Sequence, residues 1–339
     1  GGSEKNDPTV GYFNYGNPSL TPKWTLAQWE TKYDFRDLEN DTMFMETADG
    51  VYKYDSLDKI LTVDTNTGEL GLQLNASKVY DAPRKDGEGW PHLLIEQGTK
   101  NAQAPFASQL KNANHLRLQF SQKLTKFEDH MGDAATGLHA GSFYIYLYVK
   151  GINEKGMMEM TWFGLPLFDN RYAFLSESGM VDGGKADASG LFIYLIPSRG
   201  FTDTDFVENG KIVASEDGEW MNIDIDVLPY IKRALTLAQE KGFMKGVTMD
   251  TVVVDGMNMG WEMPGTYDGE MKIKNLSLTS YVGTTYESNN GIYNLLVRDM
   301  DEKETVTVDE NLTVTVPKNL LEIDGIDESM LILQASKRD

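Results

Sequence analysis

The sequence contains no cysteine, and this absence excludes disulfide bonds and thiol chemistry from the 339-residue chain. It also lacks an apolar run of about 20 residues, the length that a membrane-spanning helix needs, so we expect no transmembrane span. Basic residues are the minority, since 31 Lys and Arg face 52 Asp and Glu, for a net charge of −21. This excess of negative charge argues against general binding to nucleic acid or to an anionic membrane.

The chain opens with small and polar residues, GGSEKNDPT, without an initiator Met or a signal peptide. A Gly/Ser-rich start of this kind resembles the tether of a processed bacterial lipoprotein, whose lipidated Cys would lie upstream of residue 1. A scar of recombinant expression is the alternative. The resemblance implies a bacterial protein that is secreted, periplasmic or bound to the cell surface.

The clearest pattern in the chain is an alternation that begins at Ser142, where aliphatic residues alternate with Tyr144, Tyr146 and Tyr148. A period of two predicts a β-strand with an aliphatic face and a tyrosine face. A second apolar run from 160 to 168 follows the loop sequence INEKGM, which suits a hairpin. These two strands are expected at the centre of a sheet.

Short alternating runs bounded by Gly, Asn and Asp recur between about residues 49 and 285. A parallel α/β sheet would need helices between its strands, but one clear helix is predicted, from Leu228 to about Lys241, with Asp226 as its N-cap. A second, short helix is predicted from Trp24 to Phe35. The pattern therefore predicts an all-β fold, an antiparallel β-sandwich or jelly roll with one or two short helices.

The composition divides the chain into three parts. Residues 1–22 are predicted to form a flexible tether, and residues 23–286 the β-sandwich domain. Residues 287–339 are plainer and more acidic, and are predicted to form an additional β element or a small C-terminal extension. Within this last part, residues 305–316 show a second hairpin pattern.

A polar and aromatic sheet face is the first candidate site. Strand alternation places Trp90, His92 and Glu96 on one face of their strand, and Arg117 on the polar face of another. Together with Tyr144 and Tyr146, these residues have the chemistry of a glycan-binding surface. Aromatic rings stack on sugar faces, and the polar groups bind hydroxyls. The alternative is an ordinary solvated face, or a face covered by the helix and loops.

The sequence Phe168-Asp-Asn-Arg-Tyr172 ends the second central strand and offers two interpretations. Asp169 and Arg171 beside aromatic residues could clamp a ligand. They could also form a structural turn with an internal ion pair, which is the interpretation that we favour.

The segment around residues 252–280 resembles the closing segment of secreted jelly-roll, concanavalin A-like proteins that act on or bind carbohydrate. The residues that carry this resemblance are Trp261, Glu262, Pro264, Gly265, Tyr267 and Asp268, followed by the strand from Met271 to Leu278. The resemblance implies a concanavalin A-like sandwich with a connection to glycans, and places Trp261 among the ligand-binding candidates. It implies no particular activity, because the tight acidic motif typical of the family's hydrolases is absent; Asn222, Asp224 and Asp226 come nearest.

Catalysis would require carboxyl groups at a suitable separation. A glycosidase needs two, about 5–10 Å apart, and Glu96 with Glu262 or with Asp224 could meet across a sheet. A polysaccharide lyase would need a base such as His92 or a tyrosine, with Arg117 neutralising a uronate. Because the chain has 52 acidic residues, some pair always looks suitable.

Metal binding has one weak candidate, the turn that contains Asp64, Asn66 and Glu69. It looks like the start of a calcium loop, but it lacks the distant bidentate Glu, and a hairpin turn explains the same residues better. The four His residues lie far apart without zinc spacing. Calcium is the one cofactor that the sequence suggests.

The sequence favours a glycan-binding β-sandwich that takes part in polysaccharide uptake or degradation. The first alternative is a glycoside hydrolase or polysaccharide lyase on the same fold, with Glu96, Glu262 or His92 as catalytic candidates. The second is a structural or adhesion module whose aromatic face binds another protein. The expected partner in the first two cases is a polysaccharide or oligosaccharide.

Overall fold

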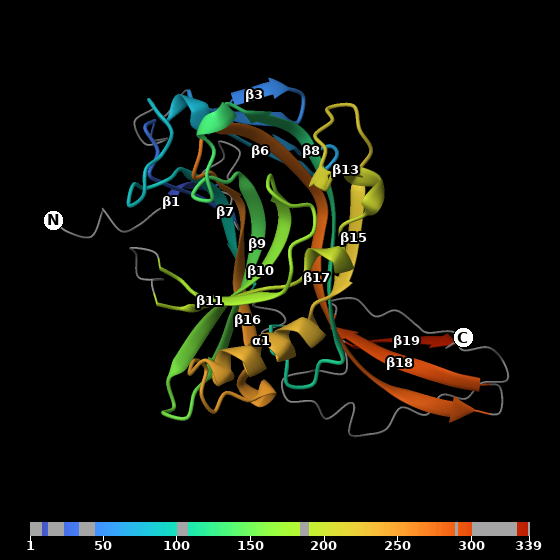
Figure 1. Ribbon diagram of the computed structural model, residues 1–339. Coiled ribbons are helices and arrows are strands. Elements are labelled where there is room, and N and C mark those ends of the chain that lie inside the picture. The colour runs from blue at the N-terminus through green and yellow to red at the C-terminus, as the bar shows by residue number, and fades with distance from the viewer. Residues whose placement is uncertain are drawn as a thin grey trace.

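The computed structural model describes residues 9–12, 24–33, 45–99, 108–183, 190–288, 291–299 and 331–337. Their strands form two large sheets that stack face to face around a shared apolar core (Figure 1). The fold is the antiparallel β-sandwich of jelly-roll type that the sequence predicts. None of the helices in these ranges is both long and apolar enough to cross a bilayer.

Sheet A has eight strands, in the spatial order β1 (Thr9–Tyr12), β2 (Trp24–Trp29), β7 (His92–Gly98), β16 (Val253–Glu262), β9 (Ser142–Ile152), β10 (Met158–Asp169), β12 (Phe192–Leu195) and β11 (Ser178–Val181). Its neighbours pair antiparallel, except β10 and β12, which are parallel. The predicted central hairpin is confirmed, because β9 and β10 pair antiparallel along their full length.

Sheet B has the order β15 (Met221–Asp226), β8 (His115–Asp129), β17 (Tyr267–Ser288), β6 (Glu69–Asn75), β5 (Lys59–Asp64), β4 (Val51–Asp55) and β3 (Met45–Ala48). Off this path, β18 (Gly291–Asp299) pairs with β17, and β19 (Leu331–Lys337) pairs with β18. A separate short hairpin joins β13 (Val207–Glu208) to β14 (Lys211–Ile212). The 3₁₀ turns are η2 (Ala76–Lys78), η3 (Gly132–Ala134), η4 (Ser198–Gly200), η5 (Thr204–Phe206) and η6 (Met249–Thr251).

The core lies between the two sheets, and the alternation of each strand decides what enters it. On β9 the residues at odd positions, among them Phe143 and Leu147, are fully buried, while the tyrosines between them face outward. Trp261 on β16 also points inward, and its indole N–H donates to the carbonyl oxygen of Leu72 on sheet B at 2.8 Å. Burying these side chains supplies most of the force that holds the sheets together.

Several strands change the side on which they present apolar residues, among them β16 and β17. The pairing of β16 with β9 shifts between Val254 and Met257, and the pairing of β17 with β8 shifts between Lys274 and Ser277. Each shift is a β-bulge, in which one extra residue reverses the in–out alternation beyond it. In β17 the bulge includes Asn275, whose φ of +56° is tolerated better by asparagine than by most side chains.

The predicted helix is confirmed as α1 (Leu228–Glu240), with Pro229 in its first turn. Its N-cap is Val227, so the prediction of Asp226 is wrong by one position. Asp226 still accepts the N–H of Leu228 at 3.2 Å. Gly242, at φ +90°, ends the helix. The helix lies across one end of the sandwich and contacts strands of both sheets (Figure 1).

The helix predicted from Trp24 is wrong, because residues 24–29 form strand β2 of sheet A. Trp24 and Leu26 point toward the core in alternation with Thr25 and Ala27, and the strand pairs with β1 on one side and β7 on the other. Pairing with two neighbouring strands therefore determined the conformation of this segment, although its local sequence is compatible with a helix. Residues 34 and 35 lie outside the described residues.

Two further predictions concern segments that the structure describes only in part. Within the predicted tether, residues 9–12 form β1 and pair with β2, and the other residues of 1–22 lie outside the described ranges. Within the predicted C-terminal extension, β18 and β19 are strands. The hairpin predicted for residues 305–316 lies outside the described residues.

Candidate functional site

The outer face of sheet A carries the candidate site, on the side of the sheet that faces away from the core. We call it the polar-aromatic face and define it by the outward side chains of β2, β7, β16, β9 and β10. These are Trp29, His92, Glu96, Asn258, Glu262, Tyr144, Tyr146, Tyr148 and Trp162.

Strand register arranges these side chains in rows across the sheet. In one row, Trp29 pairs with His92, and His92 with Glu262. In another row, Glu96 pairs with Asn258, and Asn258 with Tyr146. The two rows are four residues apart along β16, which is roughly 13 Å at the rise of a strand.

His92 and Glu262 form the most reactive pair on the face. Nδ1 of His92 lies 2.8 Å from the carbonyl oxygen of Trp90, and Nε2 lies 3.5 Å from a carboxylate oxygen of Glu262. Because a carbonyl oxygen can only accept, Nδ1 must carry a proton. Nε2 then faces the carboxylate of Glu262 across this 3.5 Å contact.

The pKa of Glu262 defines the charge of this carboxylate. Burial raises the pKa, but the contact with His92 and the indole N–H of Trp90 lower it by more, so the pKa lies below its ordinary range. Glu262 is therefore ionised near neutral pH, and 32% of its side chain is exposed. The pair presents an ionised carboxylate beside a proton-holding imidazole, which suits hydrogen bonding to hydroxyl groups.

Aromatic rings enclose this pair on two sides. Trp90 stacks on His92 with ring centroids 5.6 Å apart, and Trp29 meets the imidazole edge-on at 5.5 Å. The guanidinium of Arg84 also lies over the Trp90 ring, 4.7 Å from its centroid. The stack of Arg84, Trp90 and His92 fixes the orientation of the imidazole.

Glu96 belongs to a second polar group, with Tyr148 and Asn258. Burial raises the pKa of Tyr148, the charge of Glu96 and the hydrogen bond to it raise the pKa further, and a hydrogen bond with Asn258 opposes them in part. The phenol therefore stays neutral and donates to the Glu96 carboxylate. Among the described residues, the side-chain oxygen of Asn258 has no hydrogen-bond partner.

Glycines make room for the tyrosines to lie flat on the sheet. A side chain at Gly164 would meet the ring of Tyr146 at 2.6 Å, and one at Gly256 would meet the ring of Tyr148 at 2.9 Å. Trp162 contacts both tyrosine rings edge-on, at 5.9 and 5.0 Å between centroids. The result is a packed surface of aromatic side chains, each of which is partly buried.

The turn after β10 contains the internal ion pair that the sequence favours. Arg171 donates to both carboxylate oxygens of Asp169, at 2.9 and 2.7 Å, and Asp169 is fully buried. The hydroxyl of Tyr144 lies 3.4 Å from the same carboxylate. The structural interpretation is confirmed, and the pair anchors the end of the face nearest to Tyr144.

Two of the predicted ligand-binding residues lie elsewhere. Arg117 is on the outer face of sheet B, where its guanidinium reaches Asp224 at 2.6 Å, so the expectation that it shares a face with His92 is wrong. Trp261 is buried in the core and cannot reach a ligand on either face. Sequence alternation assigns each residue to a face of its own strand, but it does not say which strands belong to the same sheet.

The structure also separates most of the residue pairs that the sequence suggested for a hydrolase or a lyase. Asp224 lies on sheet B, opposite to Glu96, so these two carboxylates cannot form a pair. Glu96 and Glu262 share a face, but they lie in rows roughly 13 Å apart, and each carboxylate is held by its own partner. Arg117 is likewise too far from His92 to serve a lyase.

The weak calcium candidate forms a hairpin turn between β5 and β6. One carboxylate oxygen of Asp64 accepts the N–H groups of Asn66 and Thr67 at 2.8 and 3.3 Å. These hydrogen bonds lower the pKa of Asp64. Glu69 begins the returning strand and lies 3.7 Å from Lys274. The predicted hairpin turn is confirmed.

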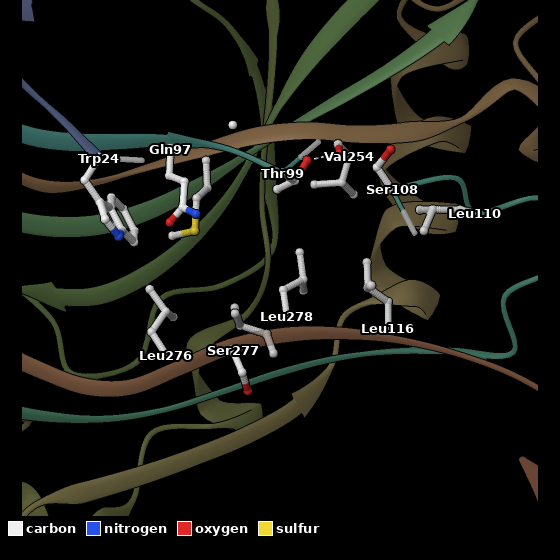
Figure 2. A pocket seen from close by; sticks show the side chains of 13 residues that line it. Trp24, Gln97, Thr99, Ser108, Leu110, Leu116, Val254, Leu276, Ser277 and Leu278 are labelled. Carbon is white, nitrogen blue, oxygen red and sulfur yellow. Dashed lines mark hydrogen bonds between the residues drawn. The ribbon is translucent and has the colours of Figure 1, made fainter. Parts of the chain in front are cut away.

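A separate cavity of about 240 Å³ opens between the two sheets, away from the polar-aromatic face (Figure 2). Trp24, Val254 and Met257 line it from sheet A, and Leu276 and Leu278 from sheet B. Its lining residues include no titratable side chain, so they offer no acid–base chemistry. Both β-bulges border the cavity, because Val254, Met257 and Ser277 flank them.

The sequence analysis missed three residues of the face: Trp29, Trp162 and Asn258. Trp29 was assigned to a helix. Trp162 carried a usable signal, since it alternates with Thr161 and Phe163 in a strand that was recognised. Asn258 could have been found in the same way, because it alternates with Met257 and Met259 within residues 256–262.

Comparisons with known proteins give no family for this chain. A scan against protein-family models found no match, and a search of curated proteins found none. Among solved structures, the chain is similar to the family 11 xylanase from Neocallimastix patriciarum, at 7% identity and a TM-score of 0.37, over 77% of this chain and 93% of that chain. It is also similar to a cellulase derived from the Cel12A cellulase of Rhodothermus marinus, at 10% identity and a TM-score of 0.35, over 76% and 99%. At TM-scores below 0.5 these likenesses carry no argument, and the sandwich rests on the strand pairing of this chain.

Proposed function

We propose that the polar-aromatic face binds a neutral or weakly charged glycan without covalent chemistry. The observation that supports this most is the combination on one outer face of half-buried aromatic rings with carboxylate, imidazole and amide groups. Rings of Tyr146, Tyr148 and Trp162 offer stacking surfaces for sugar rings. Glu262, His92 and Asn258 offer acceptors and donors for hydroxyl groups.

The charges of the face favour a neutral ligand. Glu96 and Glu262 bring two carboxylates, and the nearby Arg171 is already paired with Asp169. A polyanionic glycan would meet repulsion from the face and from a chain of net charge −21. The setting that we propose is a secreted or cell-surface protein of a bacterium, in polysaccharide uptake or degradation.

The test is affinity electrophoresis of the full chain against a panel of neutral polysaccharides, with and without calcium. Trp162→Ala and Tyr146→Ala should each weaken retardation by roughly tenfold, the loss of about 1.4 kcal/mol expected for a stacking residue. Trp220→Ala is the matched control, because Trp220 is a half-buried tryptophan on sheet B that contacts Lys123 and Lys274. Unchanged affinity in both face variants would overturn this location of the site.

Glycoside hydrolysis on the same face is the second candidate, and the proton-holding pair of His92 and Glu262 favours it. In that case the ionised Glu262 would act as a base toward the attacking water, and His92 would hold its carboxylate in position. Release of sugar from any polysaccharide of the panel, lost in Glu262→Gln, would establish an enzyme. Retardation without product supports binding alone. No response to any glycan would shift the proposal to a protein-binding module.

A further inference from the structure

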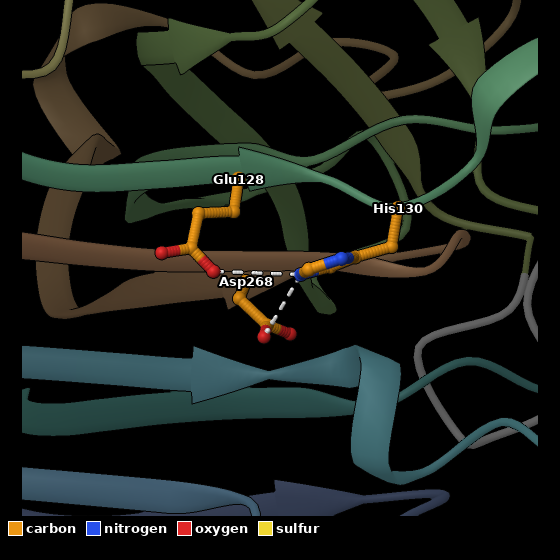
Figure 3. A group of neighbouring side chains, drawn as sticks. All are labelled: Glu128, His130 and Asp268. Carbon is orange, nitrogen blue, oxygen red and sulfur yellow. Dashed lines mark hydrogen bonds and ion pairs between the residues drawn. The ribbon is translucent and has the colours of Figure 1, made fainter.

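We propose that Glu128, His130 and Asp268 form a binding site for one divalent transition-metal cation, with zinc as the representative ion. Glu128 on β8 and Asp268 on β17 belong to sheet B, and His130 follows the end of β8, so that the three side chains point toward one another (Figure 3). One potential ligand atom from each lies within 4.8 Å of the other two. The site is independent of the proposed glycan binding.

The distances within this group fit the coordination shell of a small cation. Nε2 of His130 lies 3.2 Å from Oδ2 of Asp268 and 3.5 Å from Oε2 of Glu128. Ligands that each lie about 2.1 Å from a metal are separated by roughly 3.0 Å in an octahedron and 3.4 Å in a tetrahedron. The cation would bind between Nε2 and the two carboxylate oxygens.

The register of β8 and β17 places the carboxylates of Glu128 and Asp268 close together, although like charges repel. Asp268 on β17 stands directly opposite Glu128 on β8. Like charges in a directly opposed pair destabilise a sheet, because their side chains are held close together. A bridging cation removes this cost, whereas the imidazole does so only while it carries a second proton.

Asp268 is already oriented as a ligand by contacts outside the group. The backbone N–H and the hydroxyl of Ser77 donate to its two carboxylate oxygens, at 3.0 and 2.8 Å. Only 8% of the Asp268 side chain is exposed, against 44% for His130 and 54% for Glu128. The group thus has a fixed inner ligand and two accessible outer ligands through which an ion can enter.

The chemistry of the donors selects the kind of ion. Calcium and magnesium prefer shells made of oxygen, whereas an imidazole nitrogen with two carboxylates suits zinc and related divalent ions. Lys126 is the natural competitor, because its ammonium group lies 3.4 Å from the same oxygen of Glu128. Removing Lys126 should therefore strengthen binding.

The test is calorimetric titration of the metal-stripped full chain, without a polyhistidine tag, using zinc chloride. One saturable site is expected in the wild type, weakened at least tenfold in His130→Gln and in Glu128→Gln, and tightened in Lys126→Gln. His115→Gln is the matched control, because His115 is a similarly exposed histidine on β8 that lies 2.7 Å from the single carboxylate of Asp226. It should bind zinc as the wild type does.

A thermal melt separates a specific site from loose binding to an acidic surface. Zinc should raise the melting temperature of the wild type and of His115→Gln, but not that of His130→Gln, and calcium at the same concentration should not reproduce the rise. Equal zinc affinity in the wild type and His130→Gln would overturn the proposal, and so would a wild type without a saturable site.

Discussion

The outer faces of the two sheets differ in what surrounds their polar side chains. On sheet B, charged residues pair across strands, as in Arg117 with Asp224 and His115 with Asp226. On sheet A there is a cross-strand ion pair as well, Lys150 with Asp255, but the central polar groups are held among aromatic rings, as His92 is between Trp29 and Trp90. Exposed ion pairs keep a sheet soluble and contribute little stability. Half-buried rings with oriented polar groups are typical of a surface that meets a ligand.

The largest loss of stability should come from Trp261, the core residue of β16 that lies next to Glu262 of the polar-aromatic face. Trp261→Ala leaves a cavity beside Phe143 and Phe168 and removes the hydrogen bond to Leu72, so unfolding should become easier by about 3–5 kcal/mol. Trp220→Ala, on the outer face of sheet B, should cost about 1 kcal/mol or less. Urea denaturation of the two variants measures both. Similar losses would contradict the assignment of Trp261 to the core.

The next largest effect should come from Gly164, which leaves room for the ring of Tyr146 on the outer face of sheet A. Gly164→Ala would bring a methyl group into the ring of Tyr146, so we expect a loss of about 1–3 kcal/mol and weaker glycan binding. Gly71→Ala is the counterpart on the outer face of sheet B, where the nearest atoms lie at an ordinary 3.5 Å. It should leave both properties nearly unchanged. Denaturant melts and affinity electrophoresis of both variants decide the question, and equal tolerance at the two positions would break the contrast.

A smaller effect should appear in the pH dependence of stability. The pKa of Glu262 is lowered in the folded state, so its contribution is complete above the ordinary range of a glutamate and is lost as the pH falls through the lowered pKa. The difference in melting temperature between the wild type and Glu262→Gln should therefore shrink from pH 6 to pH 3. His92→Gln should remove much of the same dependence, since His92 is the main cause of the lowering. A constant difference across this range would contradict the ion pair.

The smallest effect should come from the charged pair on sheet B. Arg117 and Asp224 are 37% and 46% exposed, so a double-mutant cycle with Arg117→Gln and Asp224→Asn should give a coupling of about 0.2–1 kcal/mol. Glycan binding should not change in any of these variants. A loss of glycan affinity in Arg117→Gln would place the ligand on the other side of the sandwich.

The strands of this protein could be predicted from the sequence because burial leaves a period of two. Phe143 to Val149 alternate so regularly that the central hairpin needed no other information. The assignment of Arg117 and His92 to one face failed because alternation is local, whereas membership of a sheet depends on pairing between distant segments. Trp261 was misplaced for a related reason, since a resemblance of motif does not say which side of its strand faces the core.

The candidate metal group shows the same limit. Glu128 and His130 are two residues apart and share a face, which the sequence shows. Their third partner, Asp268, comes from another strand and is fixed only by the register of β8 with β17. Spacing rules for metal sites find ligands on one turn or loop, and they miss ligands that a sheet brings together.

The bulge at Asn275 makes β17 unusual in its response to insertions and deletions. Before the bulge, Met271 and Ile273 face the core, and beyond it Leu276 and Leu278 do. Loss of a single residue from an ordinary strand turns every later side chain to the opposite side of the sheet. Loss of Asn275 would instead remove the extra residue of the bulge, so regular alternation would still direct Leu276 and Leu278 toward the core. The bulge is thus a place where β17 can lose one residue and keep its apolar side chains on the core side, whereas the same loss within the regular part of the strand would reverse them.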